Sequence, residues 1–107
     1  MNTFEKAVVF SFTEAIAYTA SGIVSRQVMK NEKGNVSLFA FSAGEGLSEH
    51  TAPFDALVQI IDGESDIIIG GNVHKLVAGE SIIMPANISH ALQARSAFKM
   101  ILTMIKT

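Results

Sequence analysis

The sequence predicts an all-β fold in which two antiparallel sheets enclose a core, and three observations support this prediction. From Val36 onward, short runs of apolar residues alternate with turn residues. The runs recur at intervals of roughly 8–12 residues, which is typical of a sandwich or a barrel. Several runs are apolar on both faces, so both faces must be buried. Two packed sheets or a closed barrel meet that requirement, whereas a single open sheet does not.

Six apolar segments in the last two thirds of the chain are predicted strands. They are residues 36–42, 56–61, 65–69, 73–77, 81–84 and 98–105. The pairs Asp62-Gly63 and Gly70-Gly71 separate consecutive segments and supply the positive φ of tight hairpin turns, so we expect a hairpin at each pair. A period-two apolar face on the last segment, predicted to be core rather than a cofactor contact, comprises Phe98, Met100, Leu102 and Met104.

The first third of the chain is less regular. Residues 6–10 and 23–29 are predicted strands, with a turn at residues 31–35. A helical turn is expected at residues 13–18, because the Thr13 hydroxyl can cap the start of a helix. The length suits one domain over residues 1–107. Within it, residues 36–107 form the barrel, and residues 1–35 supply N-terminal strands and a dimer-forming segment.

Composition excludes several classes of function. The formal net charge is -2 and the basic residues are scattered, so we expect no nucleic-acid partner and no binding to an anionic membrane surface. Cysteine is absent, which excludes disulfides, thiolate metal sites and thiol catalysis. Glu5 and Lys6 interrupt the pattern of a signal peptide, and no apolar stretch reaches the ~20 residues of a membrane helix. These features predict a soluble, cytoplasmic protein without a membrane partner.

Two of the three histidines lie where residues often face the mouth of a cavity. His50 follows a loop at residues 44–49, and His90 follows a loop at residues 85–89. Residues at the junction of a loop and a strand frequently contribute to binding sites. His74 follows a hairpin turn instead, and we expect it to be exposed.

The spacing around these histidines resembles the two sequence motifs of the cupin superfamily. The first motif aligns on Gly44, His50, Ala52, Ala56 and Gly63. The second aligns on Gly79, Pro85, Asn87, His90 and Ala94, and neither alignment needs a gap. The resemblance, to a small single-domain cupin of the RmlC-like type, implies a double-stranded β-helix, that is, a jelly-roll barrel of two antiparallel sheets. It also implies a metal site made by three histidines and one glutamate.

The metal-binding motif is degenerate in this chain. Ala52 takes the position of the second histidine and Ala56 that of the glutamate. Asp55 and Gln59 are out of phase with position 56 on a strand, and Glu49 is out of phase with His50, so a third ligand requires a bulge or a loop. We therefore expect His50 and His90 to hold a divalent metal only weakly. Asn87 at the glycine position is benign, because Asn tolerates positive φ.

These residues predict a pocket for a small organic ligand inside the barrel. Mostly apolar walls with a few polar groups are typical of ligand pockets, and the expected lining is Ala52, Phe54, Ala56 and Met84. His50 and His90 are the candidate catalytic residues, since imidazole titrates near neutral pH and can act as a general acid or base without a metal. Two alternatives stay open: a metal-dependent oxygenase or isomerase with a third ligand, and a non-catalytic sensor or binding module.

The sequence also predicts a homodimer. Four large apolar residues are out of phase with the predicted pocket face: Phe39, Phe41, Leu57 and Ile101. Exposed to water, they would form a larger apolar patch than a soluble monomer usually shows, and a two-fold interface would bury them. The alternative is that they pack beneath the N-terminal third of the same chain.

Overall fold

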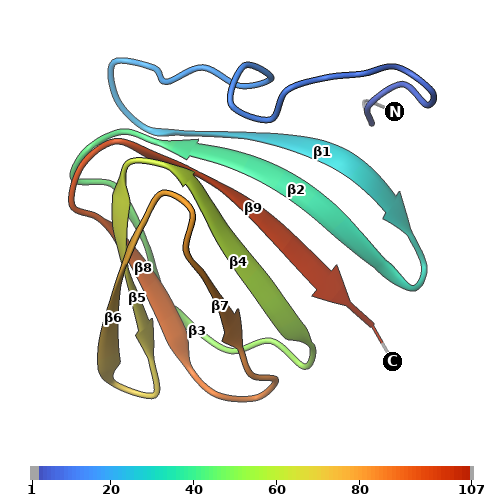
Figure 1. Ribbon diagram of the computed structural model, residues 1–107. Coiled ribbons are helices and arrows are strands. Elements are labelled where there is room, and N and C mark those ends of the chain that lie inside the picture. The colour runs from blue at the N-terminus through green and yellow to red at the C-terminus, as the bar shows by residue number, and fades with distance from the viewer. Residues whose placement is uncertain (1–2, 107) are drawn as a thin grey trace.

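The structure, a computed structural model, describes residues 3–106 and confirms the all-β prediction (Figure 1). Nine strands follow one another in this part of the chain. They are β1 (Ile23–Asn31), β2 (Gly34–Phe41), β3 (Gly46–His50), β4 (Asp55–Asp62), β5 (Glu64–Ile69), β6 (Asn72–Val77), β7 (Ser81–Met84), β8 (His90–Ala94) and β9 (Phe98–Ile105). The described residues contain no helix of the length and apolarity needed to cross a membrane.

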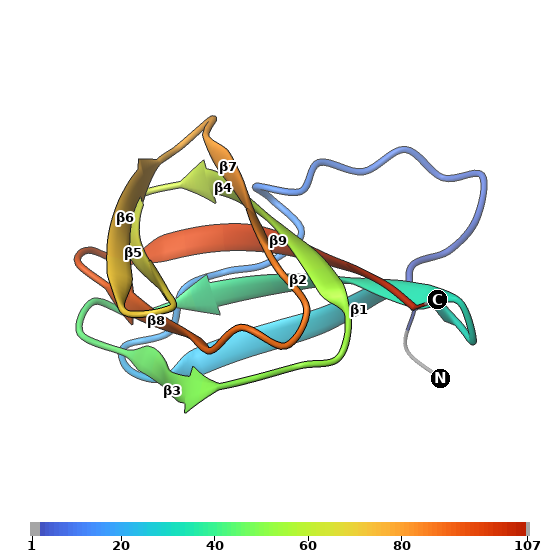
Figure 2. The same cartoon turned by 90° about the horizontal axis from the view of Figure 1, so that it is seen from below.

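The strands form two sheets whose neighbours are not neighbours in sequence. The five-stranded sheet has the order β1-β2-β9-β4-β7, and the four-stranded sheet has the order β3-β8-β5-β6. All pairs are antiparallel. Seen from below, the four-stranded sheet curls around one side of an interior that β4, β9 and β2 close on the other side (Figure 2). This is the jelly roll that the two sequence motifs imply.

Two strands, β3 and β8, were not predicted from the sequence. In β3 only Leu47 is a large apolar residue, and the last three residues of the strand are exposed. In β8 a histidine and a glutamine interrupt the apolar pattern. Because β3 pairs only with β8 at the edge of its sheet, its outer residues need not be apolar.

The two glycine-bearing turns have different roles. Gly70-Gly71 closes the predicted hairpin, with Ile69 opposite Asn72 in the register of β5 and β6. The hairpin expected at Asp62-Gly63 is wrong, because β4 and β5 belong to different sheets. The chain instead turns a corner there, with a φ of 76° at Gly63. A Cβ atom on Gly63 would lie 2.0 Å from the carbonyl oxygen of Ala97, so the corner packs directly against the start of β9.

The barrel interior is filled by apolar side chains from both sheets. Phe41 stacks on Phe98 with their ring centroids 4.5 Å apart, and Phe39 packs against the same cluster. The prediction that Phe39 and Phe41 lie outside the pocket face is therefore wrong. The reason is that β2 is apolar on both faces, and Leu38 and Ala40 are the residues that face outward. The period-two face of β9 belongs to the core, as predicted.

A second apolar cluster lies on the outer face of the five-stranded sheet. The segment before β1 runs across that face (Figure 1), and its Ile16 is buried there with Leu38 and Ile101. The predicted strand at residues 6–10 is absent, and the predicted helical turn at residues 13–18 is wrong because the hydrogen-bonded turn lies earlier, at residues 11–15. Ile101 faces outward as expected, but the N-terminal third of the same chain covers it. Leu57 is half-buried.

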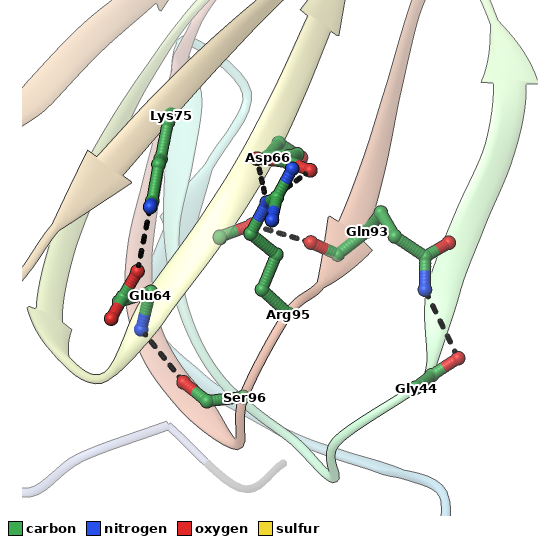
Figure 3. A network of polar contacts seen from close by, with 8 residues as sticks. Gly44, Glu64, Asp66, Lys75, Gln93, Arg95 and Ser96 are labelled. Carbon is green, nitrogen blue, oxygen red and sulfur yellow. Dashed lines mark hydrogen bonds and ion pairs between the residues drawn. The ribbon is translucent and has the colours of Figure 1, made fainter.

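A polar network fixes the register of the four-stranded sheet (Figure 3). The Arg95 Nε atom donates to both carboxylate oxygens of the buried Asp66 at 2.7 Å. Nearby, the Glu64 amide donates to the Ser96 hydroxyl, and the Gln93 side-chain amide donates to the Gly44 carbonyl. These bonds connect β5, β8 and the loop before β3. They hold in place the two strands that carry His50 and His90.

The corner at Gly63 gives a stability prediction with an internal control. Gly63 and Gly44 both have positive φ, but only at Gly63 would a Cβ meet backbone atoms. We expect Gly44→Ala to lower the free energy of unfolding by about 1–2 kcal/mol, the cost of a left-handed conformation at a residue with a Cβ. Gly63→Ala should cost at least ~3 kcal/mol, because Ala97 must also move. Chemical denaturation measures both values, and equal losses would contradict the close approach.

Candidate functional site

The structure brings His50 and His90 together. His50 ends β3, His90 begins β8, and the two are paired in the register of these strands. Their Nε2 atoms are 3.2 Å apart, and their ring centroids are 4.4 Å apart at an interplanar angle of 69°. A register shift between Leu47 and His50 is the irregularity that places the rings side by side. His74 is exposed on β6, as expected.

Backbone carbonyl groups set the protonation pattern of both rings. The Nδ1 atom of His50 is 2.8 Å from the Ser48 carbonyl oxygen, and that of His90 is 3.3 Å from the Ile88 carbonyl oxygen. A carbonyl oxygen only accepts, so each Nδ1 donates a proton. In the neutral rings both Nε2 atoms then carry lone pairs that face each other. A hydrogen shared between them, or a cation that both nitrogens bind from one side, makes this contact favourable.

The two imidazoles have different access to solvent. His50 is exposed, whereas His90 is only 5% exposed. Burial lowers the pKa of His90 below its ordinary value, and a charge on His50 lowers it further, while the hydrogen bond to Ile88 opposes both effects. His90 is therefore the neutral partner at pH 7, and His50 faces the solvent.

The two imidazoles border a small cavity of about 60 Å³ between the sheets. Its lining consists of the two imidazoles and of apolar or thioether side chains: Leu47, Ala52, Ala56, Met84, Leu92, Met100, Leu102 and Met104. Phe54 is not part of the lining; its ring lies 5.8 Å from the Lys106 ammonium group. Sequence reasoning did not assign the residues of β9 to this wall. The alternating apolar residues of β9 fit a strand that lines a cavity. A strand packed fully in the core has the same alternation.

In the part of the chain that the structure describes, no third imidazole, thiolate or carboxylate ligand joins His50 and His90 in a metal site. Within residues 3–106, no group of three or more His, Cys, Asp or Glu side chains lies close enough to hold a metal ion. Asp55 is exposed beside the buried Ala56, and its Oδ1 accepts a hydrogen bond from the Ala86 amide at 2.8 Å. Glu49 is exposed as well. Strand alternation turns these carboxylates away from the cavity, as the sequence predicts.

The separation of the two histidine nitrogens fits two ligands of a single metal ion. Two nitrogens that each lie about 2.1 Å from one ion, at an angle of about 100°, are about 3.2 Å apart. The observed separation of the Nε2 atoms is 3.2 Å. However, Ala52, just after β3, and Ala56, on β4, have methyl groups where the family pattern has an imidazole and a carboxylate. The residues present therefore supply half of the donor set implied by the resemblance.

The loop that carries His90 is anchored to the loop before β4. The Asn87 amide donates to the Ala52 carbonyl at 2.8 Å, beside the bond between Ala86 and Asp55. Asn87 has a φ of 65°, the left-handed conformation expected where the motif has glycine. These bonds fix the backbone on either side of the cavity mouth.

Comparisons with known proteins identify the family and the fold of the chain. The family model described as "Cupin domain" matches residues 37–106. A conserved protein of unknown function from Streptococcus pyogenes is 31% identical, with a TM-score of 0.93, and the match covers 99% of this chain and 93% of that one. No curated protein matches the chain.

Two further solved structures share the fold. A cupin 2 conserved barrel domain protein from Leptotrichia buccalis is 36% identical, with a TM-score of 0.88, over 91% of this chain. This chain spans 47% of that longer protein. A cupin superfamily protein from Desulfitobacterium hafniense is 24% identical, with a TM-score of 0.88, over 100% of this chain and 97% of that one.

The degenerate motif gives a prediction about divalent metals. After dialysis against a chelator, we expect the protein to retain substoichiometric iron, zinc, nickel or manganese, because two imidazoles and water hold such ions weakly. Ala52→His with Ala56→Glu should restore the donor set and raise affinity for zinc or manganese by about tenfold or more. Metal analysis and calorimetry provide the measurements. The exposed Ala43→Glu is the control, and a folded double variant without any gain would contradict the motif alignment.

Proposed function

The chain belongs to the cupin family, and from that premise we propose that it binds a small organic ligand inside the barrel, beside His50 and His90. One observation carries the proposal: two imidazoles whose Nε2 atoms are 3.2 Å apart border a cavity whose other walls are apolar. A few placed polar groups on an apolar surface are the usual composition of a ligand pocket. The two imidazoles fix the polar end of the ligand, and the methionine-rich wall accommodates its body.

The chemistry of the walls narrows the class of ligand. A hydroxyl or carboxylic acid group beside the two Nε2 atoms donates a hydrogen to one of them and relieves the opposition of their lone pairs. The cavity has room for only a few water molecules, at about 10–15 Å³ each. The ligand is therefore short, or it extends past the exposed His50 into solvent. Unbranched methionine side chains can shift to admit an apolar group.

The same pair can carry out acid–base chemistry without a metal. His90 is buried and neutral, so its Nε2 accepts a proton from a bound group. His50 lies within hydrogen-bond distance and is exposed, so it can pass that proton to solvent. A ligand with an acidic hydrogen held between the rings is the substrate class that this arrangement favours. A protein without turnover of such ligands is instead a sensor or binding module that uses the same pocket.

A metal-dependent oxygenase or isomerase is the second candidate, and the separation of the Nε2 atoms favours it. His50 and His90 would hold the ion, and the ion would supply Lewis acidity toward a bound oxygen atom. The missing carboxylate at Ala56 argues against tight binding of a divalent ion. Metal content therefore separates this candidate from the metal-free one, and turnover separates an enzyme from a binding module.

Ligand binding can be tested with short acids and alcohols as probes. We expect propionate, butyrate or the corresponding alcohols to shift the imidazole ¹⁵N resonances of His50 and His90 in metal-free protein. Ala56→Leu fills the cavity and should abolish the shifts, because three added carbons occupy the space of the probe. The exposed Ala43→Leu is the matched control. Unchanged shifts in a folded Ala56→Leu protein would place the probes elsewhere, and no shift with any probe would contradict the proposal.

We also propose that the protein forms a homodimer. The residues that first suggested an interface do not support it, since Phe39 and Phe41 face the interior and Ile101 is covered. Other large apolar side chains remain exposed, among them Met29 at 60%, Ile83 at 61% and Ile105 at 65%. The strands β1 and β7 are the edges of the five-stranded sheet, and natural proteins cover such edges.

Analytical ultracentrifugation tests the dimer directly. We expect the mass of two chains at micromolar concentration, with dissociation on dilution. Ile83→Lys, on the edge strand β7, should shift the equilibrium toward the monomer, because a charge would be buried in the interface. The exposed Glu80→Lys, just before that strand, is the control. A monomer whose sedimentation does not depend on concentration would refute the dimer.

A further inference from the structure

The donor atoms of the cavity are of two kinds only. Its lining residues carry the imidazole nitrogens of His50 and His90 and the thioether sulfurs of Met84, Met100 and Met104. None of the side chains in the lining contains oxygen. Three of the five methionines of the chain border this one small space. Every donor is uncharged when the imidazoles are neutral.

Two of these methionines flank the position where the family pattern has a carboxylate. Ala56 on β4 is opposite Met84 on β7 and opposite Met104 on β9. Side chains directly opposite each other in neighbouring strands have Cβ atoms about 4.5–5.5 Å apart. The small alanine thus lies between two long, unbranched thioether side chains on the inner face of the sheet. Met84 is only 3% exposed, so its sulfur is confined to the interior.

This set of donors selects among metal ions by their softness. Magnesium, calcium and manganese prefer oxygen ligands, which the wall lacks. Thioether sulfur selects soft ions, and cuprous copper accepts imidazole and thioether together. The cost of burying an ion among neutral donors rises with its charge. A singly charged ion is therefore the better match to an apolar cavity.

We propose that the cavity is a cuprous-ion site formed by His50 Nε2, His90 Nε2 and the thioether sulfur of Met84 or Met104. The two Nε2 atoms, 3.2 Å apart, are donors on the four-stranded sheet. Met84 and Met104 are donors on the five-stranded sheet across the cavity. The ion lies between the two sheets, where it relieves the opposition of the imidazole lone pairs. The proposal uses the histidines of the ligand-binding site but does not require an organic ligand.

The competing explanation is that the methionines only fill the core, and conservative substitution separates the two. Met→Leu keeps apolar volume and usually costs less than about 1.5 kcal/mol, but it removes the sulfur. The informative variant is Met84→Leu with Met104→Leu. Met29→Leu is the matched control, because Met29 is 60% exposed on β1 and outside the cavity. His50→Ala removes one nitrogen donor at the exposed end of the site.

The experiment is an anaerobic competition for Cu(I) against the chromogenic chelator bicinchoninate in ascorbate buffer, with protein stripped of metal beforehand. We expect the wild-type chain and Met29→Leu to withdraw one Cu(I) per chain. Both His50→Ala and the double leucine variant should bind Cu(I) about tenfold more weakly or worse, since each loses a ligand. X-ray absorption should show sulfur bound to copper in the wild type and none in the double variant. Thermal unfolding checks that the variants are folded.

Two results would overturn the proposal. One is a wild-type chain that does not withdraw Cu(I) from the chelator. The other is a folded double leucine variant with wild-type affinity and an unchanged copper spectrum. The organic probes are titrated into metal-free protein, so a failed copper competition leaves the ligand-binding result intact. Failure of the probes likewise leaves the copper result intact.

Discussion

The site depends on one constraint: β3 pairs with β8 so that His50 lies opposite His90. The positions of the rings are set by the backbone, because each Nδ1 is bonded to a carbonyl two residues earlier in the chain. The imidazoles therefore cannot turn their Nε2 atoms apart without losing those bonds. Two acceptor atoms held at 3.2 Å need a shared hydrogen or cation. The register of two strands thus creates a position where a proton, a hydrogen-bond donor or a cation stabilises the pair.

Much of the fold followed from the sequence because strand patterns and motif spacing are local. The strands of the barrel core appeared as apolar runs between turn residues, and the motif spacing identified the two histidines that meet. Other features depend on tertiary contacts. Positive φ at Gly63 is required both by a hairpin and by a corner between sheets, so the sequence alone does not distinguish them. Edge strand β3 has a largely polar pattern, which resembles a loop.

The orientation of β2 shows why some site and interface residues were misplaced. A strand that is apolar on both faces has no preferred phase in its sequence, since period two marks a face only when the other face is polar. In β2 one face fills the barrel and the other contacts the N-terminal segment. The wall residues of β9 were ambiguous for a related reason. A methionine in the core and a methionine at the wall of a cavity occupy the same phase of the strand.

The two walls of the cavity are constrained to different degrees. Strand β9 is paired on both sides, with β2 and β4, in the middle of the five-stranded sheet. Its outward Ile101 is also fixed beneath the N-terminal segment, so its backbone has little freedom to move. Adaptation on this wall must come from side chains, and methionine is the apolar residue with the most freedom to adjust.

The opposite wall has fewer constraints, because β3 is an edge strand with β8 as its single neighbour. His50, at the end of β3, is exposed while His90 is buried. Displacing β3 breaks one set of ladder bonds, whereas displacing β9 breaks two. The cavity is consequently easier to open on the side of His50 than on the side of the five-stranded sheet. This asymmetry leaves His50 as the more adjustable of the two imidazoles and His90 as the more fixed one.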